Sequence, residues 1–463
     1  TLHATPNEIA VLSRLGYSVV LVGTADRSPI GKANRKGLGA YKDYNALTDM
    51  LEAYASDFPA IARLYTLGQS VQGRELWVMR VSDNPDNEED EPEFKYVADM
   101  HGDETVGGEL CLYFIDLLLK EYGVSQRITD LVDSTEIWIV PRMNPDGFEA
   151  VRRENASGFD LNRSFPVFPA DFDGTLFDGA PLADASRPVE TAHVMRWTVD
   201  NSFVLSANFH GGALLVNYPY DNVPGIASGS NAPSPDDALC QELSLRYSTA
   251  NPPMFNSAEF ARGISNGSAW FSILGGMQDW NYRYAGCLEV TLEVSNAKIP
   301  VEATLSDFWG DNQESMLAYL ESVHIGVRGL VTDRKSGEPL WAKVAVESNE
   351  QPVFSDPDVG DYHRLLLPGA YSLTLSATGY IAWTESGVTV GEGGATRVDV
   401  ALSDGDIDED GLVAATDAQQ VVNALNGETG GFNRDVDGGG VGATDLQAVV
   451  DAVLEFDTAL GNG

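Results

Sequence analysis

Apolar and polar residues recur with two different periods along this chain, and the periods divide it into regions. Between residues 37 and 325, short apolar runs of strand length alternate with stretches in which apolar residues return every three or four positions. Strands are expected at 94–100, 136–141, 203–209 and 287–295, and helices at 44–58, 107–122 and 187–201. This alternation predicts an α/β domain with a mixed, largely parallel sheet flanked by helices.

The pattern changes on both sides of this region. Short alternating strands cut by Gly and Pro turns predict a small β-sandwich over residues 326–402, with strands at 327–333, 343–348, 362–368, 371–377 and 397–403. Residues 1–36 carry a short helical pattern, an apolar strand and a basic linker, and form a separate N-terminal segment. Residues 403–463 hold 13 acidic residues against one basic residue, and are expected to form a small helical module.

Length and charge narrow the class of protein. A chain of 463 residues is expected to form two to four domains, and no apolar run reaches the roughly 18 residues of a membrane span. A net charge of −40 argues against nucleic acid as a partner, and favours solubility, high salt or calcium. Cys111, Cys240 and Cys287 allow one disulfide at most and leave the compartment open. Because the chain starts at Thr1 rather than Met, removal of a signal peptide and secretion are expected.

Two of the six histidines share one context, an apolar strand followed by His-Gly. These are His101 and His210, and Glu104 stands three residues after the first of them. Ligands of open α/β sheets lie beyond the carboxyl ends of the strands, where both imidazoles fall. Two His and one Glu with an open fourth position form a common catalytic zinc set. The alternative is a surface histidine near an unrelated glutamate, and His193 and His3 are interpreted as structural or solvated.

The strand at 287–295 carries a second signal. Its apolar residues alternate with Glu289 and Glu293, so both glutamates lie on one face. Two carboxylates on an apolar strand require water or a cation nearby. Glu293 is the candidate catalytic base and Glu289 a supporting residue, whereas an exposed edge strand with solvated glutamates is the alternative.

Several motifs in this region occur together in one known family. They are MNPDGFE, GFDLNRSFP, NFHGGALLVNYPYD, GISNGSAW, GGMQDWNY and CLEVTLEVS. In this order the chain strongly resembles the zinc metallocarboxypeptidases, and most closely the regulatory branch that includes carboxypeptidases E, N and D. The resemblance runs from about residue 41 to 402, and its β-sandwich resembles the transthyretin-like domain of that branch.

The resemblance implies roles for the metal-site residues. His101, Glu104 and His210 match the zinc ligands, and Asp160 matches a carboxylate that orients the first histidine. Glu293 matches the general base, which takes a proton from water and passes it to the leaving amine.

The resemblance also implies how a substrate is held. Asn162 and Arg163 match the pair that binds the terminal carboxylate, a task suited to an amide and a guanidinium fork. Arg153 matches the arginine that stabilises the oxyanion, with Arg152 beside it as the alternative by one position.

Two positions bear on substrate choice. Phe271 stands where the family usually has a tyrosine that closes over the substrate, so its ring can cover the site but cannot donate a hydrogen bond. In the branch that this chain resembles, an aspartate at the place of Asp221 selects Lys or Arg, and Gln278 is the other candidate for the pocket floor. A solvated loop aspartate is the alternative for Asp221.

The acidic tail contains two similar units with the spacing of calcium-binding loops. In the first, Asp406, Asp408, Asp410 and Asp417 occupy positions 1, 3, 5 and 12, with Gly at position 6. The second unit, from Asp435 to Asp445, is one residue shorter and lacks an oxygen ligand at position 5. Together the units resemble a dockerin, which docks secreted bacterial enzymes onto cohesin partners. A disordered acidic tail is the alternative.

These observations predict a secreted zinc carboxypeptidase that releases single C-terminal residues, Lys or Arg above all, and that also binds calcium. The alternatives are a catalytically impaired relative that binds peptide tails and an amidase-type relative that acts on cell-wall peptides. Asn162 and Arg163 weigh against the amidase, because they suit a free terminal carboxylate. Residues 1–36 resemble the remnant of a pro-region or form a small subdomain.

Overall fold

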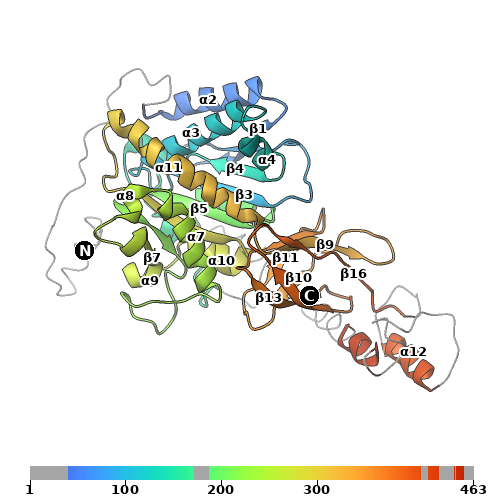
Figure 1. The fold of residues 1–463 in the computed structure, drawn as a ribbon. Coiled ribbons are helices and arrows are strands. Elements are labelled where there is room, and N and C mark those ends of the chain that lie inside the picture. The colour runs from blue at the N-terminus through green and yellow to red at the C-terminus, as the bar shows by residue number, and fades with distance from the viewer. Residues whose placement is uncertain (1–39, 172–186, 408–414, 427–442, 444, 453–463) are drawn as a thin grey trace.

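The computed structural model describes residues 40–171, 187–407, 415–426, 443 and 445–452. An α/β region (described residues up to 325) is followed by a β-sandwich region (326–402) and by a pair of short helices at the far end (Figure 1). The predicted N-terminal segment, residues 1–36, lies outside the described residues. None of the described helices has the length and apolar character needed to cross a membrane.

One eight-stranded sheet forms the centre of the α/β region, in the order β1-β2-β4-β3-β5-β8-β6-β7. Its strands are β1 Ala62–Gln69, β2 Glu75–Val81, β3 Glu93–Val97, β4 Glu136–Val140, β5 Leu205–His210, β6 Ala213–Tyr218, β7 Ile264–Asn266 and β8 Leu288–Ser295. The four central strands β4, β3, β5 and β8 are parallel to one another. Antiparallel pairs flank them on both sides. The predicted α/β class with a mixed sheet is confirmed, and its parallel part is the centre of the sheet.

Helices cover both faces of this sheet. They are α2 Tyr44–Asp57, α3 Val106–Glu121, α4 Gln126–Val132, α5 Pro145–Ala150, α6 Val189–Val199, α7 Asp237–Thr249, α8 Pro252–Phe255, α9 Gly267–Trp270, α10 Met277–Ala285 and α11 Leu305–Leu320. One face packs against α3, α7 and α11, and the other against α6 and α10. The central strands are buried on both faces, so the polar residues among their apolar positions need partners inside the protein.

The polar residues inside these strands form a bonded network. Glu289 is fully buried on β8, and its carboxylate accepts hydrogen bonds from Ser206 (2.5 Å), Asn208 (2.7 Å) and Asn281 (2.5 Å). Lys95, also fully buried, lies near enough to oppose the rise in the pKa of Glu289 that burial causes. The pattern of this strand predicts water or a cation beside both of its glutamates. For Glu289, three neighbouring hydrogen-bond donors and the nearby Lys95 ammonium supply that stabilisation.

The β-sandwich region consists of two small sheets around one core. The sheets have the orders β11-β10-β13-β14 and β12-β9-β15, and β16 also pairs with β9. The strands are β9 Val327–Asp333, β10 Lys343–Val346, β11 Val353–Phe354, β12 Asp361–Arg364, β13 Gly369–Ser376, β14 Trp383–Val390, β15 Thr396–Arg397 and β16 Val400–Leu402. Buried and half-buried residues alternate strictly along β9, which is the pattern that the sequence predicted here. Strand β14 was not predicted, because its sequence is largely polar.

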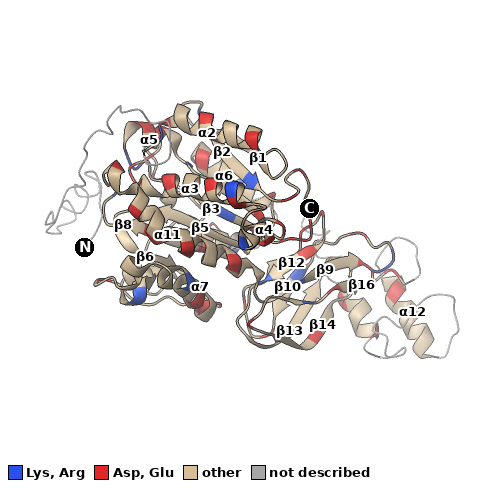
Figure 2. Cartoon of the chain, turned by 45° about the horizontal axis from the view of Figure 1, so that its top comes forward, with Lys and Arg blue, Asp and Glu red and all other residues tan. Residues whose placement is uncertain are grey.

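The acidic tail has a small core of its own. Helix α12 (Ala415–Leu425) and the helical residues 445–452 bring Val421 and Val449 against Ile407. Asp408, Asp410, Asp435 and Asp437 lie outside the described residues. Acidic residues are spread over both larger regions as well as the tail (Figure 2). The packed apolar faces argue against a wholly disordered tail.

A buried ion pair joins the two larger regions. Arg364 on β12 donates to Asp236 just before α7 (2.8 Å), and both side chains are about 95% buried. Asp236 also accepts hydrogen bonds from Tyr282 (2.8 Å) and Asn349 (2.7 Å). All three cysteines are buried and free, so the one disulfide that their number allowed is not formed.

We expect Asp236→Asn to destabilise the protein by about 3–5 kcal/mol, because it leaves the Arg364 guanidinium buried without its anion. Asp86→Asn is the matched control. Asp86 pairs with Arg63, but its side chain is 58% exposed, so its loss should have a much smaller effect on stability. Urea denaturation followed by tryptophan fluorescence measures both values. Equal shifts in the two variants would show that the pair between the regions contributes little.

Candidate active site

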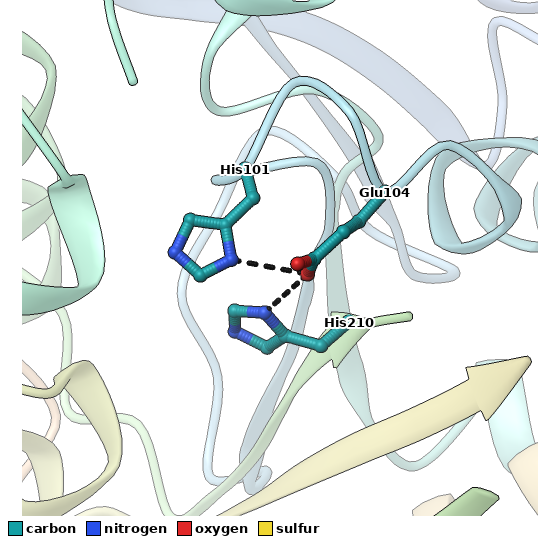
Figure 3. Close-up of side chains that lie close together, drawn as sticks. All are labelled: His101, Glu104 and His210. Carbon is teal, nitrogen blue, oxygen red and sulfur yellow. Dashed lines mark hydrogen bonds and ion pairs between the residues drawn. The ribbon is translucent and has the colours of Figure 1, made fainter. Parts of the chain in front are cut away.

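Three buried side chains converge at the carboxyl edge of the central sheet. His101 follows β3, His210 is the last residue of β5, and Glu104 precedes α3. Glu104 Oε2 lies 3.0 Å from His101 Nδ1 and 2.8 Å from His210 Nδ1 (Figure 3). The side chains point toward one another because β3 and β5 are parallel neighbours that end at the same edge.

This arrangement fits a single cation. The potential ligand atoms of His101, Glu104 and His210 all lie within 4.8 Å of one another, and two imidazoles with one carboxylate are a donor set suited to zinc. Burial, together with the nearby His101, lowers the pKa of His210 to about 4. The imidazole is therefore neutral at pH 7, which is the form that binds a metal.

The second ring nitrogen of His101 is held by Asp160. Its Nε2 lies 2.9 Å from Asp160 Oδ1, while Arg153 donates to Asp160 Oδ2 at 2.8 Å. Burial opposes ionisation of Asp160, yet His101 and Arg153 lower the pKa of its carboxyl below the usual range. A carboxylate in this position fixes the orientation of the ring.

Of the two neighbouring arginines, only Arg153 faces the convergent side chains. It donates to Glu104 Oε1 at 3.3 Å and lines the cavity beside the site. The guanidinium of Arg152 instead donates to the backbone carbonyl of Asn155. This geometry favours Arg153 over Arg152 as the candidate for the arginine that stabilises the oxyanion.

Glu293 lies directly beside His210, its register partner on β8. Its Oε2 is buried and has no hydrogen-bond partner. Burial and the Glu104 carboxylate raise the pKa of Glu293 to about 8, although Lys298 and Arg153 oppose the shift. A cation among these groups would lower that pKa, and an unpaired carboxylate oxygen aimed at the site is suited to accept a proton.

Asn162 and Arg163 approach from a short 3-10 helix, residues 161–163. Asn162 Nδ2 lies 3.3 Å from His210 Nε2, and Asn162 Oδ1 accepts from the backbone N–H of Met277 at 2.9 Å. Both residues line the cavity, which has a volume of about 60 Å³. An amide and a guanidinium therefore lie within one small space beside the convergent side chains.

Asp221 and Phe271 line the same cavity. Asp221 is buried and accepts from Gln278 Nε2 at 3.3 Å. Burial and the neighbouring Asp279 raise the pKa of Asp221 well above its usual range, although Arg163 opposes the shift, so a further cation beside it would favour its charged form. The alternative of a solvated loop aspartate is wrong for Asp221. Phe271 packs edge-on against Trp270, with ring centroids 4.5 Å apart.

Sequence reasoning missed two charged residues at this site. Lys298, just after β8, lies 2.9 Å from Glu104 Oε1 and also lines the cavity. Asp279 accepts the backbone N–H groups of Asp221 (2.9 Å) and Asn222 (3.1 Å). Lys298 follows the strand of Glu293, so its place beyond the carboxyl end of that strand was an available signal. Asp279 offered none, because it is one acid among 69.

Comparison with known proteins gives two family matches. Residues 47–315 match the zinc carboxypeptidase model, and residues 326–403 match the carboxypeptidase regulatory-like domain. Carboxypeptidase D of Rattus norvegicus is 44% identical over 373 residues, which cover 76% of this chain and 26% of that protein. Carboxypeptidase M of Mus musculus is 42% identical over 363 residues, covering 73% of this chain and 79% of that protein. The chain thus spans about a quarter of the length of the carboxypeptidase D relatives that it matches.

A solved structure shares the fold at low sequence identity. The carboxypeptidase A from Helicoverpa armigera aligns with a TM-score of 0.51 and 18% identity, over 63% of this chain and 76% of that one. At this identity the likeness concerns the fold alone.

We expect His210→Ala to lower the zinc content of the purified protein sharply, because it removes one of three donors from a buried site. His193→Ala is the matched control, since His193 lies on α6 and does not line the cavity. Elemental analysis after dialysis gives zinc per chain. Full occupancy in His210→Ala would exclude the assignment.

Proposed function

Because this chain belongs to the zinc carboxypeptidase family, we propose that it is a hydrolase that releases single residues from the C-termini of peptides and proteins. The observation that carries this proposal is the convergence of His101, Glu104 and His210 beside the unpaired carboxylate oxygen of Glu293. These four residues supply a metal site and a base within one cavity.

His101, Glu104 and His210 would hold the zinc ion. When bound, zinc supplies a Lewis acid that polarises a carbonyl oxygen and makes a water molecule more acidic. Asp160 keeps the ring of His101 in position through its 2.9 Å contact with Nε2. Because the three side chains are nearly fully buried, their electrostatic interactions are screened little by water.

The remaining residues divide the work of hydrolysis. Glu293 accepts a proton from the attacking water and passes it to the leaving amine nitrogen as the C–N bond breaks. The guanidinium of Arg153 stabilises the negative charge that develops on the carbonyl oxygen. Asn162 and Arg163 bind the terminal carboxylate of the substrate, which restricts attack to the last peptide bond.

Turnover separates this proposal from the alternative of an impaired peptide-binding relative. We expect hydrolysis of short peptides, loss of it on treatment with a chelator, and recovery with added zinc. Glu293→Gln should bind zinc normally but lose at least about a hundredfold in kcat, because general base catalysis is removed. Peptides that bind without being cleaved by the wild type would favour the impaired relative.

We propose that the substrate's last side chain is basic and that Asp221 selects it. A buried carboxylate with a raised pKa gains most from a cation, which restores its charge and replaces lost solvation. Asp279 lies against the backbone of Asp221 and adds to the negative potential. Gln278 holds the Asp221 carboxylate in place with a neutral amide.

We expect the wild type to prefer C-terminal Arg and Lys strongly over Phe. In Asp221→Ala this preference should fall on the order of a hundredfold, since losing a buried charge partner typically costs about 2–5 kcal/mol. Asp200→Ala, at the exposed end of α6, should leave the preference unchanged. The ratio of kcat/KM for matched peptides measures both. Equal cleavage of Phe- and Arg-ended peptides by the wild type would remove Asp221 from the specificity pocket.

For the tail we propose a calcium-binding, dockerin-like module that docks onto a cohesin-like partner outside the cell. Asp417 supports this proposal, because its buried carboxylate accepts from the backbone N–H of Ile407, near the start of the first unit, at 2.6 Å. This contact brings position 12 of the predicted loop beside position 2, and position 12 supplies a calcium ligand in loops of this kind.

Calorimetric titration of the full chain with calcium should detect one strong site, because the second loop lacks a ligand at position 5. Asp406→Asn should weaken that site at least about tenfold, since ligand charge sets affinity in such loops. Asp451→Asn, an exposed acid on the second helix of the tail, should have no effect. Two equally tight sites would contradict the difference between the loops.

A further inference from the structure

A second and larger cavity lies between the α/β region and the β-sandwich region. Its volume is about 370 Å³, within the range of small-molecule sites. Residues from both regions line it, among them Glu93, Phe203, Trp341, Phe354, Asp361 and Tyr362. None of its lining residues lines the active-site cavity.

The two cavities lie at opposite ends of the same strands. Glu93 is the first residue of β3, while Phe203 and Gly286 precede β5 and β8. His101, His210 and Glu293 belong to the carboxyl ends of these three strands. A ligand in the second cavity would therefore be separated from the catalytic residues by the length of the sheet.

Four aromatic side chains contribute to the walls of this cavity. Trp341 and Phe354 stack with centroids 4.9 Å apart and planes at 18°, and Phe203 and Tyr362 contribute two further rings. Trp341 is 45% exposed, which leaves its ring accessible to a ligand. Aromatic faces attract cations through their quadrupole.

Buried carboxylates in the same cavity supply the negative charge that a cation needs as its partner. Glu93 and Asp361 line the cavity and are 3% and 4% exposed. Behind them lie further acids, because Glu93 is grouped with Glu88 and Asp356, with ligand oxygens within 4.8 Å of one another. Burial and the Asp356 carboxylate raise the pKa of Asp361 to about 8, as expected where negative charge lacks a cation.

The basic side chains near this cluster are engaged by other groups, and Arg328, which opposes the rise in the pKa of Asp361, donates to the backbone carbonyl of Asp90 at 3.4 Å. Arg80 pairs with Glu136 at 2.6 Å, and Arg397 pairs with Asp90 at 2.7 Å. Lys95 contacts the Phe203 ring but donates to Thr198 at 2.7 Å and is not part of the cavity lining. His363, which lies 2.9 Å from Asp361, has its pKa lowered to about 3 by burial and is neutral. The cavity therefore combines an excess of negative charge with an apolar wall.

We propose that this cavity is a second ligand site that takes a small organic cation, an ammonium or guanidinium group on an aromatic or aliphatic body. The carboxylates favour the charged group, and the aromatic rings cover the body. A single metal ion suits the cavity less well, because Glu93 and Asp361 belong to two separate groups of potential ligands. The proposal does not depend on the peptidase activity.

Calorimetry on the full chain with 2-phenylethylamine tests this directly. We expect saturable binding, and binding at least about tenfold weaker for the neutral 2-phenylethanol and the anionic phenylacetate, since charge-assisted contacts supply the affinity. Glu93→Gln should weaken binding of the amine by a similar factor. Trp341→Ala, at a partly exposed position that folding tolerates more readily, should also weaken binding while leaving peptide hydrolysis unchanged.

The active site also offers a cation pocket, so Asp221→Asn is the decisive control. Binding of 2-phenylethylamine that survives Asp221→Asn and is lost in Glu93→Gln and Trp341→Ala supports the second site. The proposal is overturned if the wild type does not bind the amine, if 2-phenylethanol binds equally well, or if Asp221→Asn abolishes binding. Calcium binding that depends on Glu93, without amine binding, would also overturn it.

Discussion

Parallel pairing of β3, β5 and β8 is the constraint on which the chemistry of this protein depends. Phe94, Leu205 and Leu288 stand in one row across the three strands, and His210 stands opposite Glu293 near their other end. Because the strands run in the same direction and in register, residues more than a hundred positions apart reach one edge together. A shift of one residue in this register would turn Glu293 to the other face of the sheet.

Two carboxylates on β8, those of Glu289 and Glu293, have different surroundings. In the middle of the sheet, Glu289 accepts hydrogen bonds from three neighbouring side chains, and Lys95 opposes the rise in its pKa. At its carboxyl edge, Glu104 gathers two imidazoles and Lys298, while Glu293 keeps an unpaired oxygen. The difference between the two carboxylates of one strand lies in what the neighbouring strands place beside them. Structural stability and reactivity are thus separated by four residues along β8.

Much of this arrangement could be predicted from the chain. The strand-end His-Gly pairs located the convergence of His101 and His210, and the alternation along β8 separated Glu293 from its apolar neighbours. The hairpin of β1 and β2 was not predicted, because its strands mix polar and apolar positions without a clear period. The contact of Lys298 with Glu104 and the cavity between the two larger regions escaped prediction for another reason, since they depend on how distant segments pack. The boundaries placed at residues 36, 325 and 402 stay predictions.

The central claim is that strand register creates one metal site from His101, Glu104 and His210. The most direct test is a crystal structure of the zinc-loaded protein with anomalous diffraction collected at the zinc absorption edge. The account predicts a single strong peak at the active site, about 2.0–2.2 Å from one nitrogen of each histidine and one oxygen of Glu104. A zinc peak elsewhere, with Lys298 still paired with the Glu104 carboxylate, would contradict it.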